Sequence, residues 1–240
     1  MKILVVNDDG IYSKNLKILV DYLKNIYNDI MVVAPSSEQS AMSHRINIKG
    51  PIKLTAHEGL FDGVKAYSID STPADCVKFA IDYLKYDFDI VFSGINDGLN
   101  LGDDISYSGT VAAILEAAYY QKKGIALSVI KGQNTNILES LEIFMQDYLK
   151  NAIYSQFLTF NVNLPQNPKG IKYVPQGKGN YIYYFTKEQD NIYTPRIKPK
   201  YQKRDIIEND LDAYYNEYIS VTPLTVDKTD YQVLNKINNK

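Results

Sequence analysis

The chain has 240 residues, which is enough to bury a large core and fits one α/β domain with an added extension better than two independent domains. Its formal net charge of -2 at pH 7 excludes a strong overall field for nucleic acid or an acidic membrane, so an anionic substrate would need local donors or a metal ion. The single cysteine, Cys76, excludes an internal disulfide framework and a cysteine-rich zinc site, which is typical of a cytoplasmic protein in a reducing compartment.

Apolar runs alternate with helical periodicity from the N-terminus onward. Residues 3–6 form a short continuous apolar run, typical of a strand buried on both faces of a parallel sheet. This run is too short for a signal peptide or a membrane span. Apolar residues then recur at i, i+3, i+4 and i+7 over residues 14–24, which predicts an amphipathic helix capped by Ser13.

The same alternation continues along most of the chain. The further predicted elements are a strand at 30–34, a helix at 72–84, a strand at 90–92, a helix at 110–120, a strand at 125–130, a helix at 137–149 and a strand at 158–162. Alternating strands and helices predict an α/β fold with a doubly wound, mostly parallel Rossmann-like sheet. We expect residues 1–165 to form this catalytic core and residues 166–240 to form a C-terminal extension packed on it. Tyr-rich alternation at 181–185 predicts a hairpin in the extension.

The loop after the first predicted strand carries two adjacent carboxylates, Asp8 and Asp9, in the sequence NDDG. Ligands of open parallel sheets bind beyond the carboxyl ends of the strands, and carboxylate oxygens are ligands that Mg²⁺ and Mn²⁺ prefer. An ordinary solvated turn is the alternative interpretation. The loop lacks G-x-G-x-x-G, which removes the main support for dinucleotide chemistry.

Two further loops follow predicted strands. In the first, Ser40 offers a hydroxyl to a metal ion, and His44 is kept as an accessory residue although a lone histidine is more often structural. The second runs over residues 93–104, includes Asn100 as another accessory residue, and is predicted to be a long structureless loop of functional importance.

Ser108, Gly109 and Thr110 stand at the start of a predicted helix. Their amides and hydroxyls would lie at the positive end of that helix, which is a ready site for phosphate. An elaborate helix cap is the alternative interpretation. Together the loops supply a carboxylate pair, neutral oxygen ligands and a phosphate cradle, which are the parts of metal-assisted phosphoryl hydrolysis.

Several spaced motifs resemble the SurE (survival protein E) family of 5'/3'-nucleotidases. The motifs, in chain order, are ILVVNDDGI, VVAPSSEQSAMSH, STPADCV, DIVFSGINDGLNLGDDISYSGTVAAILEAA, NVNLP and YISVTPLTVD. The resemblance implies that one divalent cation, Mg²⁺ or Mn²⁺, is bound in each subunit. It implies as metal ligands Asp8, Asp9, Ser40 and Asn96, and as phosphate-binding residues Ser108, Gly109 and Thr110. It also implies a homodimer or homotetramer with contacts made by the extension.

We therefore expect a metal-dependent phosphatase of the 5'-nucleotidase type, with Asp8 and Asp9 as catalytic residues and with nucleoside 5'- and 3'-monophosphates as substrates. Short polyphosphate is a further candidate substrate. The main alternative is a nucleotide-binding regulatory module without catalysis. A glycosyl or phosphoribosyl transferase is the second alternative. A nucleic-acid partner is not expected, because the chain has no wide basic face, and a membrane partner is not expected either.

Overall fold

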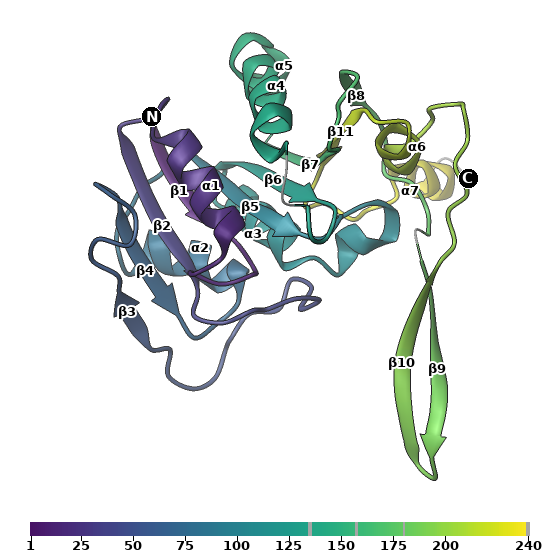
Figure 1. The fold of residues 1–240 in the computed structure, drawn as a ribbon, viewed down its shortest axis with the longest axis horizontal. Helices are drawn as coiled ribbons and strands as arrows, with labels where there is room; N and C mark the ends of the chain where they lie inside the picture. The colour runs from purple at the N-terminus through teal and green to yellow at the C-terminus, as the bar shows by residue number, and fades with distance from the viewer. Residues whose placement is uncertain (134–135, 157, 180, 239–240) are drawn as a thin grey trace.

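The computed structural model describes residues 1–133, 136–156, 158–179 and 181–238. In this part of the chain a nine-stranded sheet carries helices on both faces, and a two-stranded hairpin projects away from it (Figure 1). The strand order is β3 (Leu54–Ala56), β4 (Lys65–Ile69), β2 (Asp29–Pro35), β1 (Lys2–Val6), β5 (Ile90–Asp97), β6 (Lys123–Val129), β7 (Thr159–Leu164), β11 (Ile219–Leu224) and β8 (Ile171–Tyr173). The six adjacent strands β4, β2, β1, β5, β6 and β7 are mutually parallel. At the two sides of this group, β3 pairs antiparallel with β4, and β11 pairs antiparallel with β7. The predicted mostly parallel α/β sheet is confirmed.

Strand β1 explains how a short apolar run supports two cores. Ile3 and Val5 belong to the core on one face, and Leu4 and Val6 belong to the core on the other, because successive side chains of a strand alternate. The first core packs under α1 (Lys14–Leu23), α4 (Ile137–Lys150) and α5 (Ile153–Gln156). The second packs under α2 (Pro73–Asp82) and α3 (Gly109–Tyr119).

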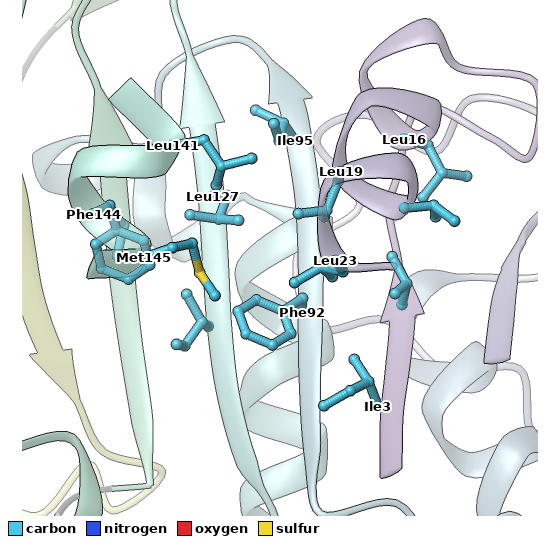
Figure 2. Packing of buried hydrophobic residues seen from close by; sticks show 14 of the residues in the cluster. Ile3, Leu16, Leu19, Leu23, Phe92, Ile95, Leu127, Leu141, Phe144 and Met145 are labelled. Atoms are coloured by element: carbon cyan, nitrogen blue, oxygen red, sulfur yellow. The ribbon is translucent and has the colours of Figure 1, made fainter. Parts of the chain in front are cut away.

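The first core consists of apolar side chains from helices α1 and α4 and from the strands that they cover (Figure 2). Its labelled side chains are Leu16, Leu19 and Leu23 of α1, Leu141, Phe144 and Met145 of α4, and Ile3, Phe92, Ile95 and Leu127 of the strands. Burying each such side chain contributes about 1.5–3 kcal/mol. The predicted Ser13 cap is confirmed, since Ser13 Oγ accepts a hydrogen bond from Leu16 N at 3.5 Å, and Thr72 Oγ1 caps α2 by accepting one from Asp75 N at 3.2 Å.

The prediction of a long structureless loop at residues 93–104 is wrong. β5 continues to Asp97, and a 3₁₀ helix, η1, spans Gly102–Ser106. The strand continues because a bulge places one extra residue between Ser93 and Asn96, after which Asn96 pairs with Ser128 of β6. The polar, glycine-containing sequence concealed this pairing.

The C-terminal part of the chain adds to the same sheet. β11 pairs with β7, and β8 pairs with β11, while the predicted hairpin is confirmed as β9 (Tyr181–Gln189) and β10 (Ile192–Pro199). Helix α6 (Asp210–Tyr215) stands at the base of the hairpin, and α7 (Tyr231–Asn238) is the last described helix (Figure 1). The division into a core and an extension at residue 165 stays a prediction. None of the described helices combines the length and the apolar character that crossing a membrane requires.

Candidate active site

A pocket of about 380 Å³ opens where β1, β2 and β5 end and α3 begins. It has two chemically different sides. Its polar floor consists of Asp8, Ser40, Asn96 and Ser108. Its apolar wall consists of Tyr107, Tyr181, Tyr183 and Ile197. Residues from three separate strand ends and from the distant hairpin therefore meet in one cavity.

Asp8 is the buried centre of the floor, with 3% of its surface exposed. Its carboxylate accepts hydrogen bonds from Thr110 Oγ1 at 2.6 Å and from Thr110 N at 3.3 Å. Burial raises the pKa of Asp8 above its ordinary value and outweighs these hydrogen bonds, which lower it. Gly109 permits this arrangement, because a Cβ there would lie 3.0 Å from Asp8 Cβ.

Asp9 lies beside Asp8 and is less buried. Burial and the neighbouring charge of Asp8 raise the pKa of Asp9 to about 6, although Asp97 N donates a hydrogen bond to its carboxylate at 3.2 Å. No lysine, arginine or histidine in the described ranges forms an ion pair with Asp8 or Asp9. The pair is thus a concentration of negative charge without a protein cation at ion-pair distance.

Asn96 reaches the floor through the bulge in β5. Gly94 allows the bulge, because its φ is +136° and a Cβ there would lie 2.4 Å from Leu127 O. Asn96 Nδ2 donates to Gly98 O at 2.7 Å. Because the amide nitrogen is committed to Gly98, the side-chain oxygen is the atom that Asn96 offers to a ligand.

Ser40 stands on the loop after β2. Its hydroxyl donates a hydrogen bond to Glu38 Oε1 at 2.6 Å, which leaves the lone pairs of the oxygen for another partner. The loop is tied to the site by two backbone hydrogen bonds, Gln39 N to Asp8 O at 2.7 Å and Ser43 N to Tyr107 O at 2.9 Å. Glu38 was not singled out from the sequence, because a glutamate in a polar loop carries no distinctive pattern.

The start of α3 divides its groups between the helix and Asp8. Ser108 Oγ caps the helix by accepting from Val111 N at 3.1 Å, and the side chain of Thr110 is committed to Asp8. The amides of Ser108 and Gly109 belong to the first turn of the helix and have no partner within it. These two amides are the groups that an anion could use, beside the carboxylate pair.

The two accessory residues have different surroundings. His44 Nε2 lies 2.9 Å from Glu116 Oε2, and Lys78 Nζ lies 3.0 Å from Glu116 Oε1. His44 therefore takes part in a cluster with side chains of α2 and α3 and is not among the residues that border the pocket. Asn100 borders the pocket and is buried. Its Nδ2 donates to Ser128 Oγ at 2.8 Å and its backbone oxygen accepts from Asn163 Nδ2 at 3.0 Å, which pins the chain after β5 to β6 and β7.

The apolar wall was missed as part of the site. The Tyr-rich alternation at 181–185 indicated a hairpin, but nothing in the sequence indicated that it reaches the end of β5. Tyr183 OH donates to Asp104 Oδ1 at 3.1 Å, and the rings of Tyr107 and Tyr183 meet edge to face with centroids 6.3 Å apart. Burial and the Asp104 carboxylate raise the pKa of Tyr183 to about 12, so the phenol keeps the proton that it donates.

The donors of the site fit a hard divalent cation. Asp8 and Asp9 supply unbalanced negative charge, and Ser40 and Asn96 supply neutral oxygens. No group of three or more His, Cys, Asp or Glu side chains in the described residues is arranged to hold a metal ion, so a cation here would depend on the neutral oxygens as well.

Comparison with known protein families gives one match over most of the chain. Residues 3–182 match the family described as Survival protein SurE. The matched range includes the whole polar floor and ends within β9.

Curated relatives match along the full chain. A protein of Thermoanaerobacter sp. named 5'-nucleotidase SurE is 40% identical and covers 100% of this chain and 98% of its own length. A protein of Clostridium botulinum with the same name is 37% identical, over 98% of this chain and 96% of its own length. Among solved structures, the SurE protein from Aquifex aeolicus superposes with a TM-score of 0.81 at 30% identity, covering 100% of this chain and 99% of that one.

Proposed function

The chain belongs to the SurE family, and from this membership together with the carboxylate pair Asp8 and Asp9 at the end of β1 we propose that it is a 5'-nucleotidase that hydrolyses nucleoside monophosphates with the help of a divalent cation. The single observation that carries the proposal is the placement of Asp8 beside the first turn of α3, with the second carboxylate, Asp9, next to it in the chain. There an anionic phosphate can be held by backbone amides next to carboxylates that lack a protein cation.

Asp8, Asp9, Ser40 and Asn96 would hold the cation, Mg²⁺ or Mn²⁺, one in each subunit. Bound there, it would polarise the phosphate and make a water molecule more acidic. The amides of Ser108 and Gly109 would hold phosphate oxygens. Hard oxygen donors of this kind are ligands that suit both metals.

Asp8 would act directly on the reacting groups. Its carboxylate is fixed in orientation by both hydrogen bonds from Thr110 and stands nearest the start of α3. It would accept the proton of the attacking water while the water oxygen bonds to phosphorus and the ester P–O bond breaks, and the leaving nucleoside oxygen would take up a proton from solvent. Direct attack by the same carboxylate is the alternative route, and a trapped phosphorylated enzyme would identify it.

We also propose that the protein assembles as a homodimer or homotetramer through its C-terminal extension. Exposed apolar side chains support this proposal. They gather on the hairpin and on α7, and they include Phe185, Tyr193, Val233, Leu234 and Ile237. Sedimentation of the full chain would test it, and a monomer at micromolar concentration would contradict it.

The experiment for the enzymatic proposal is a phosphate-release assay with nucleoside 5'- and 3'-monophosphates and short polyphosphate. Each substrate would be tested with Mg²⁺, with Mn²⁺ and with a chelator. We expect metal-dependent release that Asp9→Asn abolishes. The matched control is Asp21→Asn, because Asp21 is an exposed carboxylate of α1 paired with Lys17. Nucleotide binding without release under any metal would favour the regulatory module instead.

A further inference from the structure

The apolar wall of the pocket has no role in the chemistry described above, although it borders the same cavity as Asp8. We propose that Tyr107 and Tyr183 form a subsite that binds the nucleobase of the substrate by aromatic stacking. This inference rests on the proposed function, because it assigns the nucleoside half of the molecule whose phosphate lies at the polar floor.

The division of the pocket matches the division of a nucleoside monophosphate. One end offers carboxylates, hydroxyls and first-turn amides, and the other end offers aromatic rings with Ile130 and Ile197 beside them. A volume of about 380 Å³ falls within the range of small-molecule pockets, which combine an apolar lining with a few polar groups that fix orientation. A phosphate ion alone would need only the polar end.

The position of Tyr107 sets the expected arrangement of the ligand. It directly precedes Ser108, whose amide opens the proposed phosphate cradle. Its backbone oxygen accepts from Ser43 N at 2.9 Å, so the loop after β2 holds it in place. A phosphate at Ser108 would therefore bring the attached nucleoside alongside the ring of Tyr107.

The hairpin presents one selected face to the pocket. Tyr183 of β9 is directly opposite Ile197 of β10, so both side chains project from the same face. Tyr184 and Arg196, which are also directly opposite each other, project from the other face. The pocket is bordered by the first pair and not by the second. The alternation thus separates an apolar inner face from a mixed outer face.

The rings of Tyr107 and Tyr183 are fixed in orientation but remain exposed. Their centroids are 6.3 Å apart with an interplanar angle of 63°, and the hydroxyl of Tyr183 donates to Asp104 of η1 at 3.1 Å. Even so, 51% of Tyr107 and 59% of Tyr183 stay exposed. An exposed aromatic surface that is already oriented can stack on a base with little ordering cost.

The segments on both sides of the hairpin are hydrogen-bonded to α6, and α6 is hydrogen-bonded to η1, which follows β5. Asp210 accepts hydrogen bonds from Gly177 N, before β9, and from Gly102 N of η1, each at 2.8 Å. Asp212 accepts from Tyr201 OH, after β10, at 2.6 Å and pairs with Arg204. These contacts, called here the clips of Asp210 and Asp212, hold the apolar wall beside the polar floor of the same subunit.

The test compares adenosine 5'-monophosphate with ribose 5-phosphate, which carries the same phosphate and sugar but no base. For the full chain, Tyr183→Ala should lower the ratio of the two kcat/KM values about tenfold, chiefly through a higher KM for the nucleotide, since removing one stacked ring weakens base binding by about that factor. Tyr183→Phe keeps the ring and should retain most of the ratio. Tyr184→Ala, from the outer face of the same strand, is the matched control and should leave the ratio unchanged.

Binding is measured in parallel by calorimetry with both compounds, so the result does not depend on turnover. If Tyr183→Ala folds with an unchanged melting temperature and keeps the wild-type ratio and nucleotide affinity, the subsite is refuted. If the wild type hydrolyses neither compound but Tyr183→Ala still weakens nucleotide binding about tenfold, the subsite stands and the proposed hydrolysis fails. If Tyr183→Ala lowers the melting temperature, the affinity of the well-folded Tyr183→Phe and Tyr107→Leu variants decides, with loss expected only for Tyr107→Leu.

Discussion

The polar floor and the apolar wall border one cavity but are built in opposite ways. Asp8 of the floor is almost fully buried at the end of a central strand and is fixed by two hydrogen bonds from Thr110. Tyr183 of the wall is more than half exposed on a two-stranded hairpin and is fixed chiefly by its hydroxyl and a neighbouring ring. The floor has the rigidity that bond-breaking chemistry needs, whereas the wall can change without disturbing the core.

The sharpest test of this contrast is Asp8→Asn. Turnover should fall about a thousandfold or more, because the proton acceptor and the charge for the cation are both lost. Stability should hold or rise, since burial raises the pKa of Asp8 and an amide can still accept from Thr110 without carrying charge. Phosphate release and urea unfolding in chelator measure the two effects. A variant that keeps most activity, or that unfolds easily, would contradict a functional role for this charge.

Part of the floor could be predicted from the sequence, because Asp8 closely follows an apolar strand and Ser108 stands at the start of a predicted helix, whereas Asn96 was expected there only through the family resemblance. The pattern NDDG after residues 3–6 predicts that Asp8 and Asp9 lie at the edge of the sheet. The wall could not, because Tyr183 follows no strand of the sheet and meets Tyr107 across 76 residues through tertiary contacts, such as the bond of its hydroxyl to Asp104, that have no local sequence pattern. The course of residues 93–104 was missed for a related reason, since a bulged strand with glycines has the local composition of a loop.

The clip at Asp212 should have the next largest effect, on stability. Asp212→Asn should lower the free energy of unfolding by about 2 kcal/mol at pH 7, because a fully buried carboxylate loses charge-assisted hydrogen bonds from Arg204. Burial raises the pKa of Asp212, but the hydrogen bonds from Arg204 and Tyr201 outweigh it and hold the pKa below its ordinary value.

The sign of the pH dependence follows from that lowered pKa. The contribution of Asp212 is present above the unfolded-state pKa of about 3.9 and is lost as pH falls through the lower folded-state value. Unfolding free energies of wild type and Asp212→Asn should therefore converge as pH falls below about 4. Asp205→Asn, an exposed carboxylate of the same segment, should follow the wild-type curve. Parallel curves for wild type and Asp212→Asn would contradict the clip.

Gly109→Ala probes how closely the floor is packed. A Cβ at residue 109 would lie 3.0 Å from Asp8 Cβ and 3.1 Å from Pro73 Cγ, so Asp8 must move by a few tenths of an ångström. We expect kcat to fall about tenfold, because small displacements of a reacting group are costly. Alanine favours the helix, so stability should change by less than about 1 kcal/mol. A wild-type kcat would show that Asp8 tolerates displacement. The floor would then tolerate change as the wall does, and the contrast in rigidity would be lost.

The smallest effect is expected on the outer face of the hairpin. Arg196 is paired with Glu188 at 3.1 Å, and Lys198 Nζ lies 5.8 Å from the centre of the Tyr184 ring, so both cations are engaged on the face that the pocket does not use. The double variant Arg196→Ala, Lys198→Ala should change kcat/KM for a nucleoside monophosphate by less than about twofold, because exposed charges are screened within about 8 Å at physiological salt. The decisive measurement is the slope of kcat/KM against ionic strength. An unchanged slope assigns substrate recognition to the inner face, whereas a slope that disappears in the double variant would mean that the outer face steers the anionic substrate and that the two faces of the hairpin share the task.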